Sequence, residues 1–491
     1  MAATIIGLPV SERRALRWLV VFFGLLLAAT CVHRQIWVDE PWFGEQAASL
    51  AREGRVRSEL FRGLGLGWEE RVLVYHKLYI WLAALYAKLL GSPLAALRWA
   101  SGTSAAALAA LLFAHERRRR PLLALLLALG SGLLVKYGFI GRPEALAAVC
   151  GFASFWLLEE GRAGASGLCA GLAVLAHLNG LAFVFAGAVT LLLRKRLGAV
   201  VLFAGCAAAV AALYPLEAVL FADLRTLAFQ LRNDPGVVTA FDLRAKLKDL
   251  MDADRVLFHD LPAASATTLF VGCAVVWLAG IRQRAPLTLR YAAWLTVAMA
   301  LLQNRTSPHY LVLFLPLVLV FACETLASAA GRWRRATAVL LVLYLAGGLG
   351  YAARTLMLNR EPTAVEESRA VLARLTKPSG RLIAPMVFFF EGAPRYRVMG
   401  LHRFDHHDRR TGRFPGFDGL FAVARDEDVD AVILDRLEAR GFQYLHLPEP
   451  LPAAMPGYAL SSDDGRFAVY SHVAVPTAPR RSPPPSLRRP V

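Results

Sequence analysis

The sequence predicts an all-α polytopic membrane protein with about eleven transmembrane helices and a small extracytoplasmic α/β domain at its C-terminal end. Hydrophobic residues make up 56% of the 491 residues, and the mean hydropathy is +0.45. They form long runs almost free of charge, each close to the length that crosses a hydrocarbon core of ~30 Å. Short basic linkers separate the runs, as cytoplasmic loops do in membrane proteins.

Eleven apolar segments account for the predicted helices. They lie at 16–32, 94–114, 121–138, 143–158, 165–178, 179–193, 198–220, 262–281, 286–303, 309–329 and 336–353. If these segments cross the membrane in alternating directions, the linkers around Arg117, Arg194, Arg282 and Arg332 all lie on the same side, and all are basic. Because cytoplasmic loops carry the excess of Lys and Arg, this side is predicted to be cytoplasmic, together with the basic start of an uncleaved first helix.

Two apolar stretches fit no single ordinary span. Residues 78–90 are short, and a span there would place a run of four arginines outside, so they are predicted to form an interfacial helix on the outer leaflet. Residues 165–193 are too long for one ordinary helix, and a single span would also put two basic runs outside. Two short helices that meet at His177–Gly180 are therefore predicted.

The region after the last span is predicted to fold outside the membrane. The region contains alternating apolar stretches, such as 381–384 and 430–434, that read as strands, and residues 363–375 read as a helix, which together favour a small α/β domain. The predicted parts are a transmembrane domain at 1–354 with a first outer loop at 33–77, an extracytoplasmic domain at 355–475, and a disordered tail at 476–491 rich in Pro, Arg and Ser.

The net charge of +18 does not indicate nucleic-acid binding. Lys and Arg cluster between apolar segments, where topology and anionic lipid headgroups require them. All six cysteines lie within or beside apolar segments and none shows metal-ligand spacing. Asp405–Asp408 contains two histidines but reads as a polar loop, since no cysteine or helical histidine pair accompanies it. Neither a metal nor a cofactor is predicted.

Ionisable residues collect at the outer ends of different predicted helices. They include acids, histidines and cations, whereas the opposite linkers carry mostly Arg and Lys: Asp39, Glu40, His76, Lys77, Lys136, Arg142, Glu144, His177, Arg305 and His309, with the amides Asn179 and Asn304. Charged groups near a membrane are functional candidates. This one-sided collection predicts a pocket that faces the outer leaflet.

Several of these residues also have simpler interpretations. Asp39 can cap the helix that starts near Pro41, and Lys77 can extend to lipid headgroups. Arg142 can serve as an orientation charge or as the partner of Glu144.

Three further groups are weaker candidates. His177 reads as a hydrogen-bonded interfacial histidine at least as well as a site residue, and His309 is a weaker candidate still. The acids Asp252, Asp254 and Asp260, in the predicted outer loop at 221–261, read as solvated surface.

Five short motifs resemble those of GT-C membrane glycosyltransferases, which include protein O-mannosyltransferases and lipid A aminoarabinose transferases. Asp39–Phe43 (DEPWF) resembles the Asp-Glu motif of their first outer loop, and His76–Trp81 (HKLYIW) resembles the signature that follows it. Gly141–Leu146 (GRPEAL) and His177–Gly180 (HLNG) resemble two family turns. Ser307–Leu311 (SPHYL) resembles the start of a late helix of the family.

The resemblance covers about residues 10–355, with departures. Two prolines usual in the second motif are missing, since Leu78 follows Lys77 directly, and Leu178 replaces the proline of the "H-P-N-G" turn. The resemblance implies a GT-C-like fold in the inner (plasma) membrane, among membrane lipids, with the active site outside. It also implies a polyprenyl-phosphate-sugar donor. The acceptor is left open as a glycolipid, a polysaccharide or a protein.

The same resemblance implies residue roles in a single inverting displacement at the sugar. Asp39 is implied as the general base and Glu40 as a supporting or sugar-binding group. Lys77 is implied to hold the leaving phosphate, with Arg142 as the alternative. The other implied substrate-binding residues are His76, Glu144 and His177. The first outer loop has no Asp-x-Asp motif, which disfavours a metal-clamped diphosphate donor.

Two other classes of protein remain as alternatives. A transporter or lipid flippase is one, but no internal repeat is evident and the ionisable residues gather at one face rather than at mid-membrane. A non-catalytic assembly or sensory protein with an outer domain is the other, and its mark would be a featureless first loop.

Overall fold

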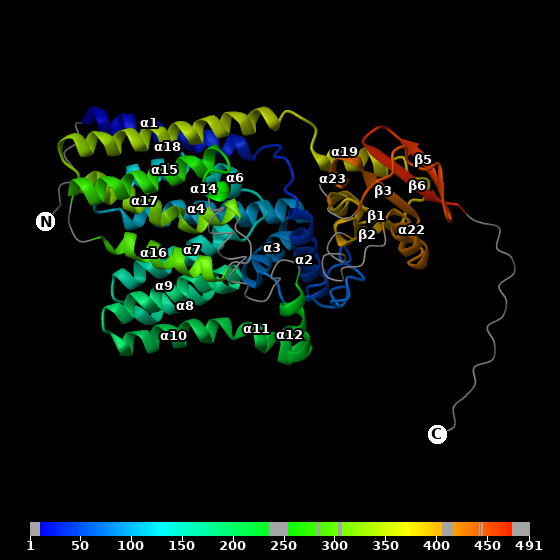
Figure 1. The fold of residues 1–491 in the computed structure, drawn as a ribbon, viewed down its shortest axis with the longest axis horizontal. Coiled ribbons are helices and arrows are strands. Elements are labelled where there is room, and N and C mark those ends of the chain that lie inside the picture. Colours follow the sequence, from blue (N-terminus) through cyan, green and yellow to red (C-terminus); the bar gives the residue numbers. More distant parts are fainter. Residues whose placement is uncertain are drawn as a thin grey trace, which may run out of the picture. The chain divides into compact units, whose positions relative to one another are not determined.

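The computed structural model describes residues 10–234, 254–281, 285–302, 307–404, 416–440, 442 and 445–473. Asp252, Arg282, Asn304, Arg305, the loop Asp405–Asp408 and the tail at 476–491 lie outside these residues. The chain divides into two compact units (Figure 1), and the second includes a short piece of the predicted first outer loop. The units are Met1–Ser58 with Gly65–Ser368, and Glu59–Leu64 with Arg369–Val491.

The described part of the first unit is helical. Its α-helices are α1 (Val10–Cys31), α2 (Glu40–Glu53), α3 (Lys77–Leu90), α4 (Pro93–His115), α5 (Pro121–Leu129), α6 (Gly132–Tyr137), α7 (Glu144–Glu159), α8 (Ala163–Ala176), α9 (Leu181–Leu193), α10 (Leu197–Ala211), α11 (Leu213–Phe221), α12 (Leu224–Asn233), α14 (Asp254–Leu257), α15 (Leu261–Val276), α16 (Leu287–Leu302), α17 (Leu311–Ser328) and α18 (Gly331–Leu358). Single turns of other helix types are η1 (Leu178–Gly180), η2 (Trp277–Ile281) and η3 (Pro308–Tyr310).

These helices make the chain a multi-pass membrane protein. Six described helical stretches are long and apolar enough to cross a membrane, at Arg14–Cys31, Pro93–His115, Leu197–Phe221, Leu261–Ile281, Pro308–Ser328 and Gly331–Leu358. Within the described residues each of the eleven predicted segments overlaps a helix, but the segment 121–138 is divided between α5 and α6, and several helices are shorter than an ordinary span. The count of eleven crossings therefore stays a prediction.

The prediction for residues 165–193 is confirmed as two helices. α8 ends at Ala176, η1 makes one tight turn, and α9 begins at Leu181. A Cβ on Gly180 would overlap the backbone of Ala173 in α8, so the returning chain packs against the helix it has just left.

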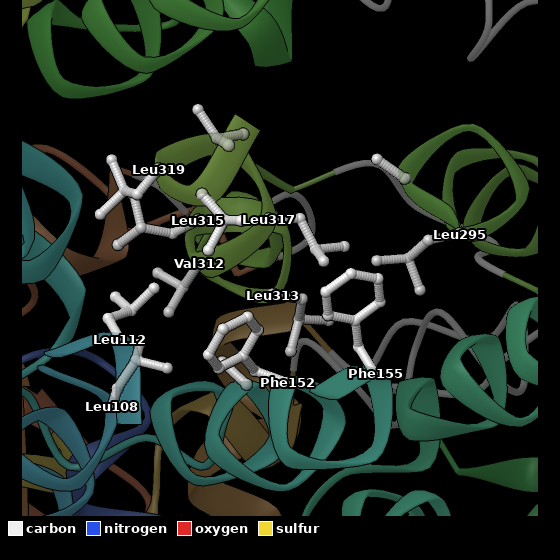
Figure 2. Packing of buried hydrophobic residues seen from close by; sticks show 14 of the residues in the cluster. Leu108, Leu112, Phe152, Phe155, Leu295, Val312, Leu313, Leu315, Leu317 and Leu319 are labelled. Carbon is white, nitrogen blue, oxygen red and sulfur yellow. The ribbon is translucent and has the colours of Figure 1, made fainter. Parts of the chain in front are cut away.

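α17 lies at the centre of the helical core. It is apolar on all sides, and nearly every side chain from Val312 to Cys323 is buried. Figure 2 shows leucines of α4 and α16 and the rings of Phe152 and Phe155 of α7 around it. α1 and α18 run beside each other along one side of this unit (Figure 1).

The first unit continues past the predicted boundary at 354. α18 runs to Leu358, and Gln35 Nε2 donates to the carbonyls of Leu358 (3.2 Å) and Glu361 (3.1 Å) in the turn that follows. These bonds attach the turn to the segment after α1. The boundary between the first and second units lies after Ser368, within α19 (Ala364–Leu372).

The second unit is built on a six-stranded mixed sheet with strand order β2-β1-β3-β6-β5-β4. β1 pairs in parallel with β2 and β3, and β6 pairs antiparallel with β3 and β5. The strands are β1 (Gly380–Ala384), β2 (Tyr396–Gly400), β3 (Ala431–Asp435), β4 (Ala454–Met455), β5 (Tyr458–Asp463) and β6 (Phe467–His472), and the short helices are η4 (Met386–Phe388), α20 (Phe389–Gly392), α22 (Gly416–Asp426) and α23 (Arg436–Ala439). The strands predicted at 381–384 and 430–434 correspond to β1 and β3.

The segment Glu59–Leu64 packs into this second unit. The amide of Gly400, at the end of β2, donates to the carbonyl of Leu60 at 2.9 Å, and the side chains of Leu60 and Phe61 are buried. Gly63 has φ +72°, and a Cβ there would overlap the guanidinium of Arg403. Six residues between the α2 region and the start of α3 thus belong to the C-terminal unit.

Candidate active site

Asp39 is the partly exposed carboxylate of the predicted site. It occupies the N-cap position of α2, but its side chain makes no capping hydrogen bond. Its Oδ2 instead accepts from Arg142 Nη1, and 35% of its side chain remains exposed. The interpretation of Asp39 as a capping side chain is therefore wrong, although its position at the helix start was predicted.

Arg142 joins groups from separate parts of the chain. Its Nε lies 3.1 Å from Glu144 Oε1, and its Nη2 donates to the same oxygen at 2.7 Å. The other end of the guanidinium reaches Asp39, and Nη2 also lies 2.9 Å from His309 Nε2. Burial acts to lower the pKa of Arg142, but the Glu144 and Asp39 carboxylates outweigh it and raise the pKa above its usual value.

Glu40 holds the turn that presents Arg142. It is fully buried; its Oε2 accepts from the Trp37 amide at 2.7 Å, and its Oε1 accepts from the Gly141 amide at 2.8 Å. Arg98 Nε lies 3.4 Å from the same carboxylate. A Cβ on Gly141 would lie 2.8 Å from Leu97, so the close approach of the turn to α4 requires glycine.

The predicted histidines His76 and His177 stack on each other near Glu144. The rings of His76 and His177 stack with centroids 4.5 Å apart and an interplanar angle of 22°. His177 Nδ1 accepts from the Asn179 amide at 3.0 Å, which leaves Nε2 protonated and 3.9 Å from Glu144 Oε1. Burial, followed by the neighbouring His177, lowers the pKa of His76 well below its usual value, so His76 is neutral at physiological pH.

His309 belongs to this group more firmly than the sequence indicated. Since Arg142 can only donate, His309 Nε2 accepts from it, and Nδ1 donates to Ser307 Oγ at 2.6 Å. Glu144 Oε1 lies 3.5 Å from the same Nε2. The sequence feature that could have indicated this role is the motif Ser307–Leu311, which contains His309.

We call the contacting side chains of Asp39, His76, Arg142, Glu144, His177 and His309 the carboxylate–arginine cluster. They come from the start of α2, the start of α3, the turn before α7, the turn after α8 and the turn before α17. The structure thus brings five of the seven predicted site residues into one connected group, and Glu40 supports it from behind.

Lys77 is paired with an acid outside that cluster. Its ammonium is fully buried, is ion-paired with Glu217, and lies over the rings of Tyr75 (4.1 Å) and Tyr214 (4.5 Å). The interpretation that Lys77 extends to headgroups is wrong, because the ammonium is enclosed by protein. Burial lowers the pKa of Lys77, and the Glu217 carboxylate opposes that shift. Sequence reasoning missed Glu217, although it is the only acid in the apolar run 197–221.

Lys136 and Asp260 form a separate ion pair near Tyr137. Asp260 Oδ1 also accepts from the Ala263 amide at 3.0 Å and caps α15. The prediction that Asp260 is solvated surface is wrong, because this helix start packs against α6.

No family model and no curated protein matches this chain. Two solved structures of ArnT from Cupriavidus metallidurans do. The one bound to undecaprenyl phosphate has a TM-score of 0.63 at 13% identity and covers 93% of this chain and 98% of that one. The apo structure has a TM-score of 0.60 at 14% identity and covers 94% and 99%. The chain therefore has the fold of ArnT, an aminoarabinose transferase, which confirms the predicted GT-C fold.

Proposed function

We propose that this protein is a membrane glycosyltransferase that moves a sugar from a polyprenyl-phosphate donor to an acceptor hydroxyl on the extracytoplasmic face, with inversion. The observation that carries the proposal is the carboxylate–arginine cluster, in which a partly exposed carboxylate is oriented by a buried guanidinium. The fold supports it, since ArnT, with the same fold, binds undecaprenyl phosphate.

Asp39 is the proposed general base. The acceptor oxygen attacks the anomeric carbon from the face opposite the phosphate, the bond from that carbon to the phosphate oxygen breaks, and Asp39 takes the acceptor's proton. Arg142 holds the Oδ2 atom of Asp39 in place, and we propose that the exposed part of the Asp39 side chain faces the substrate. Such positioned proton transfer contributes ~10²–10⁴-fold to a rate.

The leaving phosphate needs a cation, because negative charge accumulates on it as the bond breaks. Lys77 is the proposed partner and Arg142 the alternative. Arg142 already contacts Asp39, Glu144 and His309, whereas the ammonium of Lys77 has one carboxylate partner, Glu217.

The remaining predicted residues are proposed to shape the sugar site. The stacked rings of His76 and His177 hydrogen-bond the sugar or the phosphate. Glu144 binds the Arg142 guanidinium and so keeps it oriented toward Asp39. Glu40 supports the turn rather than touching sugar, since its carboxylate is buried and already bonded. The acceptor is a glycolipid, a polysaccharide or a protein, and no metal or other cofactor takes part.

Loss of the gene tests the function in cells. Mass spectrometry of lipid-linked sugars and envelope glycans should show an accumulated polyprenyl-phosphate sugar and one missing sugar residue in a product. Accumulation of that donor on the cytoplasmic leaflet, with the same sugar missing from the product, would instead identify a lipid flippase. Purified protein should transfer labelled sugar equally well with and without EDTA, and a requirement for divalent metal would contradict the monophosphate mechanism.

A further inference from the structure

Lys77 is held by a carboxylate that the proposed reaction does not use. Its buried ammonium pairs with Glu217, donates to the Leu73 carbonyl at 3.3 Å, and lies over two tyrosine rings. A buried cation without a partner is costly, so an anion beside Lys77 stabilises its charged form. In this structure Glu217 supplies it.

The Glu217 carboxylate sits where donors from other segments converge. Tyr75 Oη donates to it at 3.1 and 3.3 Å, and Arg71 Nη1 lies 4.0 Å away. An ammonium, a hydroxyl and a guanidinium around one anion are a suitable set for a phosphate headgroup. Glu217 retains 17% exposure and Arg71 25%, so the site can be reached from outside even though Lys77 itself is enclosed.

The surroundings of Glu217 favour a lipid-borne anion. α11 ends a stretch long and apolar enough to cross a membrane, and its side chains beside Glu217 are exposed and apolar, namely Leu216, Val219, Leu220 and Phe221. Lys77 is also the chain neighbour of His76, which stacks in the carboxylate–arginine cluster. A phosphate bound at Lys77 is therefore held by the residue that directly follows His76 of that cluster in the sequence.

We propose that Glu217 is an internal anion that occupies the donor phosphate's place on Lys77, so that donor binding exchanges a carboxylate for a phosphate. The inference rests on the proposed function, which names Lys77 as the phosphate partner. Glu217 keeps the empty site neutral and lowers the apparent affinity for phosphate, because the protein must release it first. A lipid phosphate and free inorganic phosphate share the required chemistry, and the apolar face of α11 favours the lipid.

Binding of undecaprenyl phosphate to purified protein tests this without any sugar transfer. Glu217→Gln keeps the side-chain shape and removes the competing charge, so its Kd should be about tenfold lower than that of the wild type. Glu217→Asp keeps the negative charge but withdraws it from Lys77 by one methylene. Its Kd for undecaprenyl phosphate should also be lower than that of the wild type, by a smaller factor than for Glu217→Gln. Inorganic phosphate should bind far more weakly than the lipid, and undecaprenol without phosphate should gain nothing from either substitution.

Glu324→Gln is the matched control. Glu324 is also an acid in an apolar helix, with 15% exposure and an arginine 3.6 Å away, but it lies far along the chain from Lys77. Its variant should bind the lipid as the wild type does. The double variant Lys77→Met/Glu217→Gln removes both charges together and should bind no better than Lys77→Met alone.

The outcomes separate the two proposals. Equal or weaker lipid binding by both Glu217 variants, with wild-type binding intact, overturns the role of Glu217 and leaves the glycosyltransferase proposal standing. Failure of Glu217→Gln to fold leaves Glu217→Asp to decide the question. Absence of binding by the wild type and every variant overturns both proposals, since no polyprenyl-phosphate donor is then recognised.

Discussion

At the scale of single residues, Asp39 separates a chemical role from a structural one. Asp39→Asn keeps the shape and can still begin α2, but it cannot accept a proton. We expect a loss of transfer of ~10²-fold or more with unchanged thermal stability, measured with labelled polyprenyl-phosphate sugar in detergent. Glu40→Gln, at the next residue, should lower stability instead, because the buried Glu40 carboxylate accepts from Arg98 and two amides. Near wild-type turnover of Asp39→Asn would remove the proposed base.

Arg142 belongs to the same scale, because one guanidinium serves three partners. Arg142→Gln leaves Glu144 buried without its cation, which should cost about 3–5 kcal/mol of stability. The double variant Arg142→Gln/Glu144→Gln should recover most of that stability in thermal melts but not the transfer activity, since Asp39 remains unoriented. Recovery of activity in the double variant would show that Arg142 serves only to neutralise Glu144.

At the scale of elements, the α8–α9 turn places His177. Gly180 returns the chain so closely that a Cβ would overlap the Ala173 backbone. Gly180→Ala should destabilise the protein by about 1–3 kcal/mol and lower activity by displacing His177 from His76. Gly205→Ala in α10 is the control, because its Cβ meets nothing within 4 Å and should leave stability unchanged or raise it by up to ~1 kcal/mol. A well-folded and active Gly180→Ala variant would mean that the turn tolerates displacement.

At the scale of the whole molecule, the second unit contains part of the predicted first outer loop. Truncation after Ser368 removes the rest of this unit, including Gly400, whose amide donates to the Leu60 carbonyl. We expect lower thermal stability and lost transfer, although the carboxylate–arginine cluster lies wholly in the first unit. Truncation after Val473 removes only the tail predicted to be disordered and should change neither. A stable and active product of the first truncation would show that the loop holds its shape alone.

Topology is also a property of the whole chain. The predicted eleven crossings from a cytoplasmic N-terminus would put the C-terminal unit outside. A reporter that is active only in the extracytoplasmic space should be active when fused after Ala474. Activity of a cytoplasm-only reporter at that position would change the parity of the crossings and place the proposed site on the other face.

Local sequence patterns were enough to predict the helices and most residues of the carboxylate–arginine cluster. Apolar length and basic linkers are local properties, so the helical segments, the break at His177–Gly180 and the strands β1 and β3 could be read directly. The motifs named Asp39, His76, Arg142, Glu144 and His177 because each lies in a short recognisable turn.

Which of these groups contact one another could not be predicted from local patterns. Arg142 and Asp39 are 103 residues apart, and Lys77 and Glu217 are 140 residues apart. Such pairs form when helices pack, and no local pattern encodes which face of a helix meets which neighbour. For the same reason the sequence did not predict that His309 joins the cluster, that Lys77 pairs with the partly exposed Glu217, or that Glu59–Leu64 belongs to the C-terminal unit.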